Sequence, residues 1–437
     1  MRLVIILISI ILSIIGYLHD FAQYPLYCVY ICVNMTILMS LTRTKDVRNN
    51  ISYIFLFLCW LIFNCLGFIH IAILDGHFYS STNITIYFLF ILSTIILYLP
   101  IKYAIIKRGT YKPFKVIDNF IITKKVAFIL MAVGVLFQLY KLATAGGFNT
   151  YSEAAYGEKL DSTVSTFFHL FGGFVGKFNV FLMPFLLRKD TKILRYIVIA
   201  YLLFNILIGA VGGSSSSLLW PTISLFLFLY FAVNSNNARR KIKLFFIGGI
   251  LIGIIGGMLI RVNRKDNANF QTVELREAYK EIMLSPTFDN VTNLRYIIDN
   301  IEPLYEPNQT IYPFVFYLPR SIFPWKPMPL GRIVGVKYVG VSEESRIAFI
   351  TGPIGDFYFD FGVLGVIFGM FFCGYIISYI TERYNCSKQN IYTWGLFVGF
   401  ISPFVNFTSW YTGWGTSVVE FFMLTMILLY VHKKYRI

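Results

Sequence analysis

The sequence predicts an all-α integral membrane protein with about twelve transmembrane helices and one large polar loop. Three observations carry this prediction. Of the 437 residues, 57% are hydrophobic and only 14% are charged, which is more apolar surface than a soluble domain can bury. Apolar runs long enough to cross about 30 Å of hydrocarbon recur along the chain. Lysines and arginines gather in alternate loops between these runs.

The predicted spans form two groups around the polar loop. Residues 1–260 hold nine of them, and residues 358–437 hold three. The first run resembles a signal peptide, but it lacks a small-residue cleavage site and another span follows at once, so we interpret it as a span. The predicted spans are residues 3–18, 22–41, 51–70, 84–106, 125–142, 164–187, 195–212, 217–233, 244–260, 359–380, 391–409 and 415–432.

The distribution of basic residues predicts the sidedness of the chain. Loops such as 43–48 and 107–125 are rich in lysine and arginine, whereas the loops at 19–21, 71–83 and 213–216 contain none. This alternation follows the positive-inside rule and predicts that both termini are cytoplasmic and that the large polar loop faces outward. The formal net charge of +16 therefore reflects membrane topology, and we predict no nucleic-acid partner.

The large outer loop, residues 261–357, has the composition of a small folded lid. Its basic and acidic residues nearly cancel, and its apolar spacing predicts short helices at 270–284 and 289–301. Seven of the fifteen prolines lie between Pro303 and Pro329, among many aromatic residues. Such aromatics suit the membrane interface and equally suit stacking on sugar rings, so both interpretations stay open.

Cations in this loop are the candidates for binding a phosphate or pyrophosphate. They break the positive-inside bias, and arginine binds phosphate oxygens through two parallel hydrogen bonds. The alternative is that they reach lipid headgroups or pair with neighbouring acids. The candidates are Arg261, Arg264, Arg320, Lys326, Arg332 and Arg346.

Two motifs carry a family resemblance. The first is Tyr317–Pro327, YLPRSIFPWKP, and the second is Thr351–Gly365, TGPIGDFYFDFGVLG. They resemble the oligosaccharide repeat-unit polymerases, the Wzy or O-antigen polymerase family, which show P-R…P-x-K-P in a large outer loop. That family then shows Gly-acid-aromatic…Phe-Gly-x-x-Gly at the entry to the next helix. Arg320 also begins an Arg-x10-Gly pattern that ends at Gly331. The resemblance covers the topology and residues 317–365, and it implies a GT-C-like architecture.

The resemblance implies an enzyme that joins oligosaccharide repeat units carried on undecaprenyl pyrophosphate, at the outer face of the bacterial cytoplasmic (inner) membrane. The product is O-antigen or a related surface polysaccharide. The implied partners are the lipid-linked oligosaccharide, the bilayer and a chain-length regulator protein, and no cofactor is expected. A ligase of the O-antigen type and a transporter or flippase of lipid-linked sugars are the alternatives. Transporters usually have paired broken helices and short outer loops, so the single large loop favours an enzyme.

The implied chemistry needs cations at the leaving pyrophosphate and a base near the acceptor hydroxyl. Glu343, Glu344 and Asp356 are all candidates for the base, and a helix-capping role explains Asp356 equally well. The sequence has no Asp-x-Asp motif, so we predict catalysis without a metal, and Glu343–Glu344 is the alternative metal-binding pair.

The chain departs from the family at one place. Related polymerases and ligases often carry a Ser-Arg step at the outer end of a mid-chain helix, where this sequence reads Gly212–Ser217 without an arginine. Arg261 or Arg264 would then have to supply that cation.

Two further residues within the span at 164–187 are notable. Lys177 is an intramembrane charge, which is a functional hypothesis by default because it is costly to bury in lipid. His169 near the outer end of the same span is interpreted first as a packed, hydrogen-bonded histidine.

Overall fold

The structure is a computed structural model in which every described element is a helix, a turn or an irregular segment. It describes residues 2–18, 24–43, 47–75, 81–113, 121–144, 175–188, 192–211, 215–233, 235, 237–238, 241–242, 290–316, 318, 323–338, 340, 349–387, 390–406 and 414–435. The chain divides into two compact units. The predicted span at 244–260 and the predicted helix at 270–284 lie outside the described residues.

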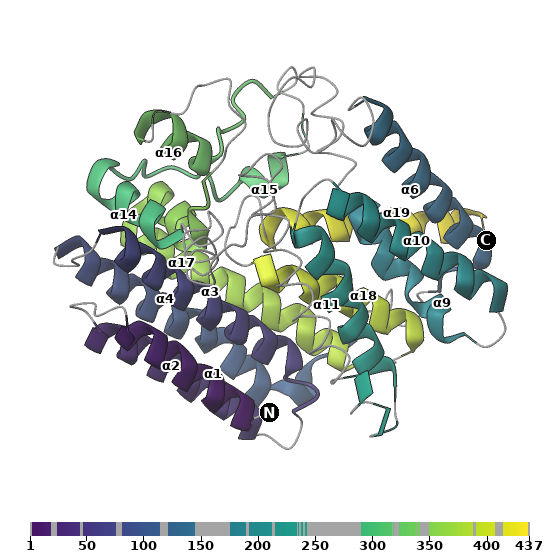
Figure 1. Cartoon of the computed structure of the whole chain (residues 1–437), viewed down its shortest axis with the longest axis horizontal. Coiled ribbons are helices and arrows are strands. Elements are labelled where there is room, and N and C mark those ends of the chain that lie inside the picture. Colours follow the sequence, from purple (N-terminus) through teal and green to yellow (C-terminus); the bar gives the residue numbers. More distant parts are fainter. Residues whose placement is uncertain are drawn as a thin grey trace, which may run out of the picture. The chain divides into compact units, whose positions relative to one another are not determined.

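The first unit comprises residues 1–112, 279–386 and 403–419. Figure 1 shows its first four helices side by side. Its elements are α1 (Arg2–Leu18), α2 (Tyr24–Arg43), α3 (Ile51–Asp75), α4 (Ser81–Ile106), η1 (Arg108–Thr110), α14 (Asn290–Asn300), α15 (Tyr312–Val315), α16 (Leu330–Tyr338) and α17 (Gly352–Asn385).

Helix α17 packs closely along α4. At Gly374, an added Cβ would lie 2.3 Å from the carbonyl oxygen of Leu97 and 2.7 Å from the ring of Pro100. Only glycine permits this approach, because it has no side chain to hold the two backbones apart.

A buried ion pair joins the ends of three helices of the first unit. Arg108 donates from Nε to Glu382 Oε2 over 2.6 Å and from Nη2 to Oε1 over 2.9 Å. The same guanidinium donates to Asn50 Oδ1, and the Tyr53 hydroxyl donates to Glu382 Oε1 over 2.8 Å. The start of α3 and the ends of α4 and α17, each next to a basic loop, therefore meet at one end of the unit.

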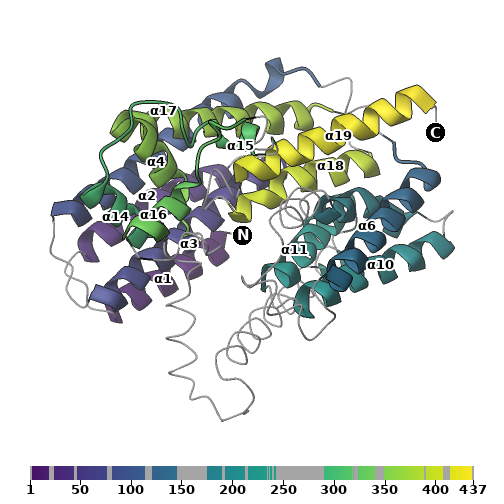
Figure 2. The same cartoon turned by 90° about the horizontal axis from the view of Figure 1, so that it is seen from above.

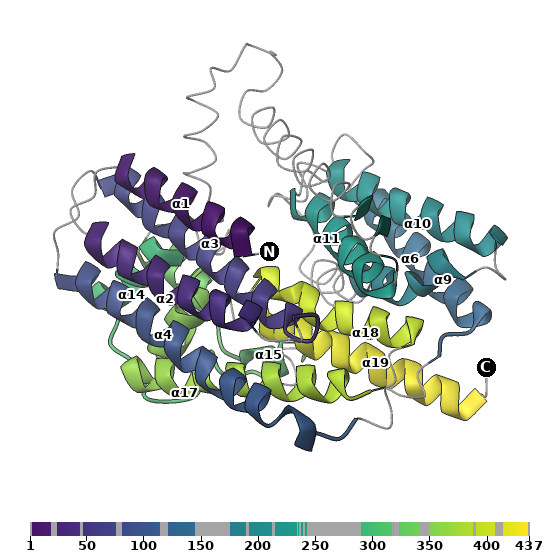
Figure 3. The same cartoon turned by 90° about the horizontal axis from the view of Figure 1, so that it is seen from below.

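The second unit comprises residues 113–278, 387–402 and 420–437. It contains α6 (Lys124–Thr144), the helical segment Val175–Leu187 with α9 (Pro184–Leu187) at its end, α10 (Lys192–Val211), α11 (Ser215–Ala232) and α18 (Ile391–Ile401). Figure 3 shows α6, α9, α10 and α11 grouped together. The short η3 (Ser402–Asn406) and α19 (Gly415–Tyr435) run across the division between units.

Lys177 has a partner in the second unit. Its Nζ lies 3.0 Å from Glu420 Oε2 on α19, and both side chains are largely buried. On the neighbouring helices, Gln138 donates to Asn205 over 3.4 Å and Asn205 donates to Asn179 over 3.2 Å. The Lys177 and Glu420 side chains and the three amide side chains are thus paired with one another, as burial away from water favours.

The described helices agree with most predicted spans within a few residues. Four of those described are long and apolar enough to cross a membrane: Tyr24–Arg43, Ile51–Leu74, Thr82–Ile106 and Gly352–Asn385. The clear difference is the last of them. We predicted a span over 359–380, whereas α17 begins at Gly352 and is broken at Phe361 and Gly362, where the backbone is not helical.

Candidate functional site

The described part of the outer loop is inserted into the helix bundle of the first unit. Asn290, the first residue of α14, donates its amide N–H to Asn64 Oδ1 of α3 over 2.9 Å. His70 and Thr292 share a 3.3 Å hydrogen bond, and Thr82 near the start of α4 donates to Asp299 over 2.6 Å. These contacts run along the length of α14, so the helix lies against the C-terminal part of α3 and the N-terminal end of α4.

The depth of this insertion follows from helix geometry. Asn64 precedes the end of α3 at Asp75 by eleven residues, and at 1.5 Å per residue it lies roughly 16 Å below that end. Helix α14 therefore begins deep within the helix bundle of the first unit. The sequence predicted a lid, whereas this part of the loop penetrates the bundle, and Asn64, Asn290 and Asn293 are buried there.

The Phe-Gly-x-x-Gly motif produces the break in α17. Gly362 has a φ of 61°, in the left-handed region that glycine adopts without strain. At Gly365 an added Cβ would lie 2.1 Å from the carbonyl oxygen of Phe357, and at Gly369 it would lie 2.4 Å from the Phe357 ring. In a straight helix, Phe357 and Gly369 would be about 18 Å apart. The segment 352–360 consequently folds back against the rest of α17.

Hydrogen bonds from the segment that follows α14 stabilise the break in α17. The N–H of Leu304 donates to the carbonyl oxygen of Phe359 over 2.9 Å, which is close to the point where the regular helix stops. The carboxylate of Asp360 accepts the N–H groups of Asn308, Gln309 and Thr310 over 3.1, 2.8 and 2.7 Å. It also accepts the Thr310 hydroxyl over 2.7 Å. Asp360 is completely buried, and these four donors compensate for the loss of water.

Gln309 connects the anchored segment to α16 through hydrogen bonds of its side chain. Its Nε2 donates to the carbonyl oxygen of Met328 over 2.9 Å, and its Oε1 accepts the N–H of Leu330 over 3.0 Å. Leu330 is the first residue of α16, and Arg332 follows in the same turn. A continuous set of hydrogen bonds thus runs from Asp360 to the helix that carries Arg332.

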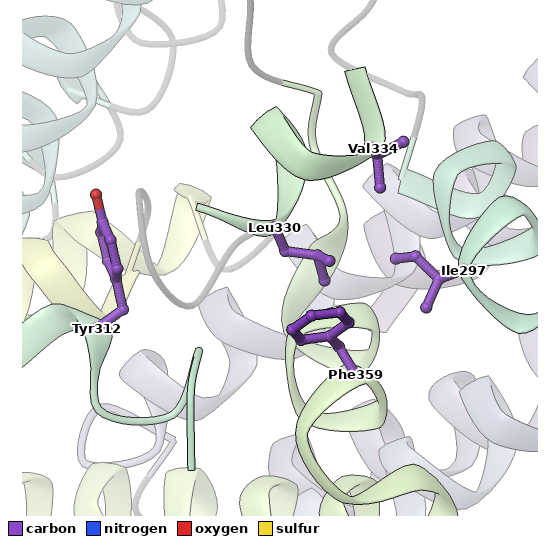
Figure 4. Packing of buried hydrophobic residues seen from close by; sticks show 5 residues of the cluster. All are labelled: Ile297, Tyr312, Leu330, Val334 and Phe359. Carbon is purple, nitrogen blue, oxygen red and sulfur yellow. The ribbon is translucent and has the colours of Figure 1, made fainter. Parts of the chain in front are cut away.

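A small hydrophobic core completes the insertion. It consists of Ile297, Tyr312, Leu330, Val334 and Phe359. Figure 4 shows Ile297, Leu330 and Phe359 pointing toward one another from three different elements. Figure 2 shows α14 and α16 beside the N-terminal part of α17. The described segments 290–316, 323–338 and 349–360 therefore form a packed structure, which we call the outer insertion after the outer loop that the sequence predicts.

Lys326 has a structural position in this insertion. Its ammonium donates to the carbonyl oxygens of Phe316 and Leu318. It also lies over the rings of Tyr312 and Phe316, 5.8 and 5.2 Å from their centroids. These contacts hold the end of α15, and binding of a phosphate by Lys326 stays a prediction.

Arg332 and Asp356 occupy neighbouring elements. Arg332 lies half-buried on α16, and the preceding carbonyl oxygen, of Gly331, accepts the N–H of Phe349 over 3.2 Å. Asp356 is completely buried in the second turn of α17, and the Thr351 hydroxyl donates to its Oδ1 over 2.6 Å. Thr351 is the residue that precedes α17, so Asp356 is not the N-cap residue of this helix. Its role as a base stays a prediction.

The other predicted site residues lie outside the described residues. They are Arg261, Arg264, Arg320, Glu343, Glu344 and Arg346.

Sequence reasoning missed Asp360, Gln309 and His70. Asp360 lies within the quoted second motif, and its proximity to the glycine break was the available signal. Nothing in the local sequence indicates that Gln309 or His70 would bond across the fold, because their partners are distant along the chain.

The fold and this insertion define the class: a helical protein with several apolar helices long enough to cross a membrane, and a folded segment inserted into the helices of its first unit. A match to the family described as O-antigen polysaccharide polymerase Wzy covers residues 1–435. The chain belongs to this family, and it polymerises the lipid-linked repeat units of O-antigen in a membrane. No curated protein and no solved structure matches the chain.

Proposed function

We propose that glycosyl transfer takes place at the outer insertion, on repeat units carried by undecaprenyl pyrophosphate at the outer face of the bacterial cytoplasmic membrane. One observation carries this placement. The insertion is packed and anchored at one end of the first unit, whereas the Arg108–Glu382 pair and its adjacent basic loops lie at the other end. Since basic loops mark the cytoplasmic side, the insertion faces outward.

The reaction transfers the growing chain from one lipid carrier to a single repeat unit on another. The acceptor hydroxyl oxygen attacks the anomeric carbon of the donor chain. A glycosidic C–O bond forms, the bond from that carbon to the pyrophosphate oxygen breaks, and undecaprenyl pyrophosphate leaves with the electron pair. The hydroxyl proton passes to a carboxylate base. Negative charge thus develops on the pyrophosphate, where fixed cations lower the barrier most effectively.

Arg332 is the cation that the described residues favour for the pyrophosphate. It lies on α16, whose first turn is held by Gln309 and Asp360, and the planar guanidinium loses little freedom for each hydrogen bond that it forms. Arg261, Arg264, Arg320, Lys326 and Arg346 are further candidates. We assign the base among Glu343, Glu344 and Asp356.

The proposal also covers metal use, membrane topology and a partner protein. Catalysis proceeds without a metal, because cations take the charge-neutralising role and the sequence offers no Asp-x-Asp pair. The twelve-span, GT-C-like arrangement with both termini in the cytoplasm is part of the same proposal. A chain-length regulator protein is the expected partner.

A carrier-release assay tests the placement. Full-length enzyme in lipid nanodiscs would receive lipid-linked repeat units extracted from a polymerase-deletion strain, and both undecaprenyl pyrophosphate release and product length would be measured. We expect Arg332→Ala to reduce release by about 100-fold and Arg332→Lys by about tenfold, because lysine keeps the charge but not the paired hydrogen bonds. A wild-type rate of undecaprenyl pyrophosphate release by Arg332→Ala would show that this arginine does not bind the pyrophosphate. Unchanged activity with a chelator present supports the metal-free mechanism, and its loss would contradict it.

A further inference from the structure

Tyr305 has a backbone conformation that its side chain disfavours. Its φ is 57°, and among the described residues it is the non-glycine residue with a positive φ. Left-handed backbone is adopted readily by glycine and asparagine but is strained for a large aromatic residue. Such strain persists where the surroundings enforce it, and it often accompanies a functional role.

The surroundings of Tyr305 enforce this conformation from both sides. The preceding N–H, of Leu304, is bonded to the carbonyl oxygen of Phe359, and the N–H of Asn308 is bonded to Asp360. Pro307 limits the backbone between these anchors, and Pro303 limits it just before the first of them. The chain must therefore turn sharply at residue 305, whichever amino acid occupies that position.

The ring points away from the protein. Tyr305 is 73% exposed, so its aromatic body is not needed for the core of the insertion. A turn that would suit glycine or asparagine instead carries a large, exposed ring. A tyrosine side chain has only two rotatable bonds, so its ring loses little conformational freedom when a ligand stacks on it.

The charges around Tyr305 indicate the class of ligand. Glu302 and Glu306 flank it and are exposed, and residues 302–310 contain no lysine or arginine. This segment would repel a phosphate or an anionic lipid headgroup. Carboxylates accept hydrogen bonds from hydroxyl groups, and the apolar face of a sugar ring suits an aromatic face. A membrane anchor, in contrast, needs no strained backbone, because an interfacial aromatic residue works from a relaxed loop.

We infer that Tyr305, with Glu302 and Glu306, forms a carbohydrate subsite that binds the sugars of the lipid-linked repeat unit beside the break in α17. This inference rests on the proposed function, because the subsite serves the glycosyl transfer placed at the outer insertion. It separates two tasks, since the arginines bind the pyrophosphate whereas Tyr305 binds the saccharide.

The test compares Tyr305→Asn and Tyr305→Phe in the full-length enzyme in nanodiscs, with lipid-linked repeat units from a polymerase-deletion strain as substrate. Asparagine adopts the left-handed region with less strain but has no ring. We expect Tyr305→Asn to raise KM roughly tenfold with kcat unchanged and with the thermal unfolding midpoint equal to or above that of the wild type. Tyr305→Phe should keep KM within about twofold. Tyr196→Ala, which removes a tyrosine that is 70% exposed on α10, is the matched control and should leave KM unchanged.

The outcomes separate the alternatives. An unchanged KM for Tyr305→Asn would overturn the subsite, and if its unfolding midpoint or membrane insertion falls instead, the ring is an interfacial anchor only. A wild-type enzyme that elongates no substrate would contradict the proposed function itself. In that case, saturation-transfer NMR with the free repeat-unit oligosaccharide as the probe still tests the subsite. A ring-dependent signal that disappears in Tyr305→Asn would support it, and an equal signal in both proteins would overturn it.

Discussion

Replacing Asp360 by alanine should release the segment 304–310 from α17 and disorder the start of α16. The carboxylate accepts three backbone N–H groups and one hydroxyl. Alanine leaves these donors without an acceptor at a position that is completely buried. The segment must then either keep unsatisfied N–H groups or move outward to reach water.

The structure sets the size of this effect. A hydrogen bond to a charged group contributes about 1.5–3 kcal/mol net, but outward movement lets the freed N–H groups hydrate. We therefore expect a local loss of about 3 kcal/mol for Asp360→Ala. Asp360→Asn should lose slightly less local stability than Asp360→Ala, because the asparagine Oδ1 still accepts hydrogen bonds. Some stability is lost because its NH2 group faces N–H donors and cannot accept from them. Thr310→Ala removes one hydroxyl donor and should lose about 1 kcal/mol.

Hydrogen–deuterium exchange measures this loss directly. A local loss of about 3 kcal/mol predicts that the amides of residues 308–310 exchange about 100-fold faster in Asp360→Ala than in the wild type. Amides of α10, in the second unit, provide the internal control and should exchange at the wild-type rate. Equal protection of residues 308–310 in the two proteins would refute the anchoring role of Asp360.

Three further predictions follow from other contacts. Glu382→Ala should cost about 4 kcal/mol because Arg108 loses its buried partner, and Glu382→Gln should cost less, both measured by thermal unfolding in detergent. Gly365→Ala should abolish folded expression, because its Cβ would lie 2.1 Å from a carbonyl oxygen, as measured by fluorescence-detected size exclusion. Lys177→Met and Glu420→Met should each lower the unfolding midpoint, whereas the double variant should recover most of it, because the single variants leave an unpaired intramembrane charge.

The Gly365 prediction has a control within the chain. Gly109→Ala should be harmless because an added Cβ there meets nothing within 4 Å. Normal expression of Gly365→Ala would contradict the folded-back form of α17. Additive losses in the Lys177 and Glu420 double variant would show that the two residues act independently.

The sequence predicts the helices well where hydrophobicity alone decides them. The predicted span at 84–106 and helix at 289–301 agree with α4 and α14 within about three residues. The start of α17 was placed too late because residues 352–360 contain glycine, proline and two aspartates. These residues are typical of a loop unless their partners elsewhere in the fold are known.

For the candidate site, the sequence indicates the motifs but not the contacts that hold them. The resemblance singles out the second motif, and two of its glycines are explained by the break at Gly362 and the close approach at Gly365. The insertion of α14 into the helix bundle could not be predicted, because it depends on pairs such as Asn290 with Asn64 that are 226 residues apart. Side chains that bond over such separations leave no local pattern in the sequence.

The most direct test of polymerisation at this site is the length distribution of surface polysaccharide on a gel. A strain lacking this protein would be complemented with the wild type, Arg332→Ala or Arg332→Lys at equal membrane levels. We expect a full ladder with the wild type, a single repeat unit on the core with Arg332→Ala, and a shortened ladder with Arg332→Lys. A wild-type ladder from Arg332→Ala would contradict the proposed site, and an unchanged ladder in the deletion strain would contradict polymerisation by this protein.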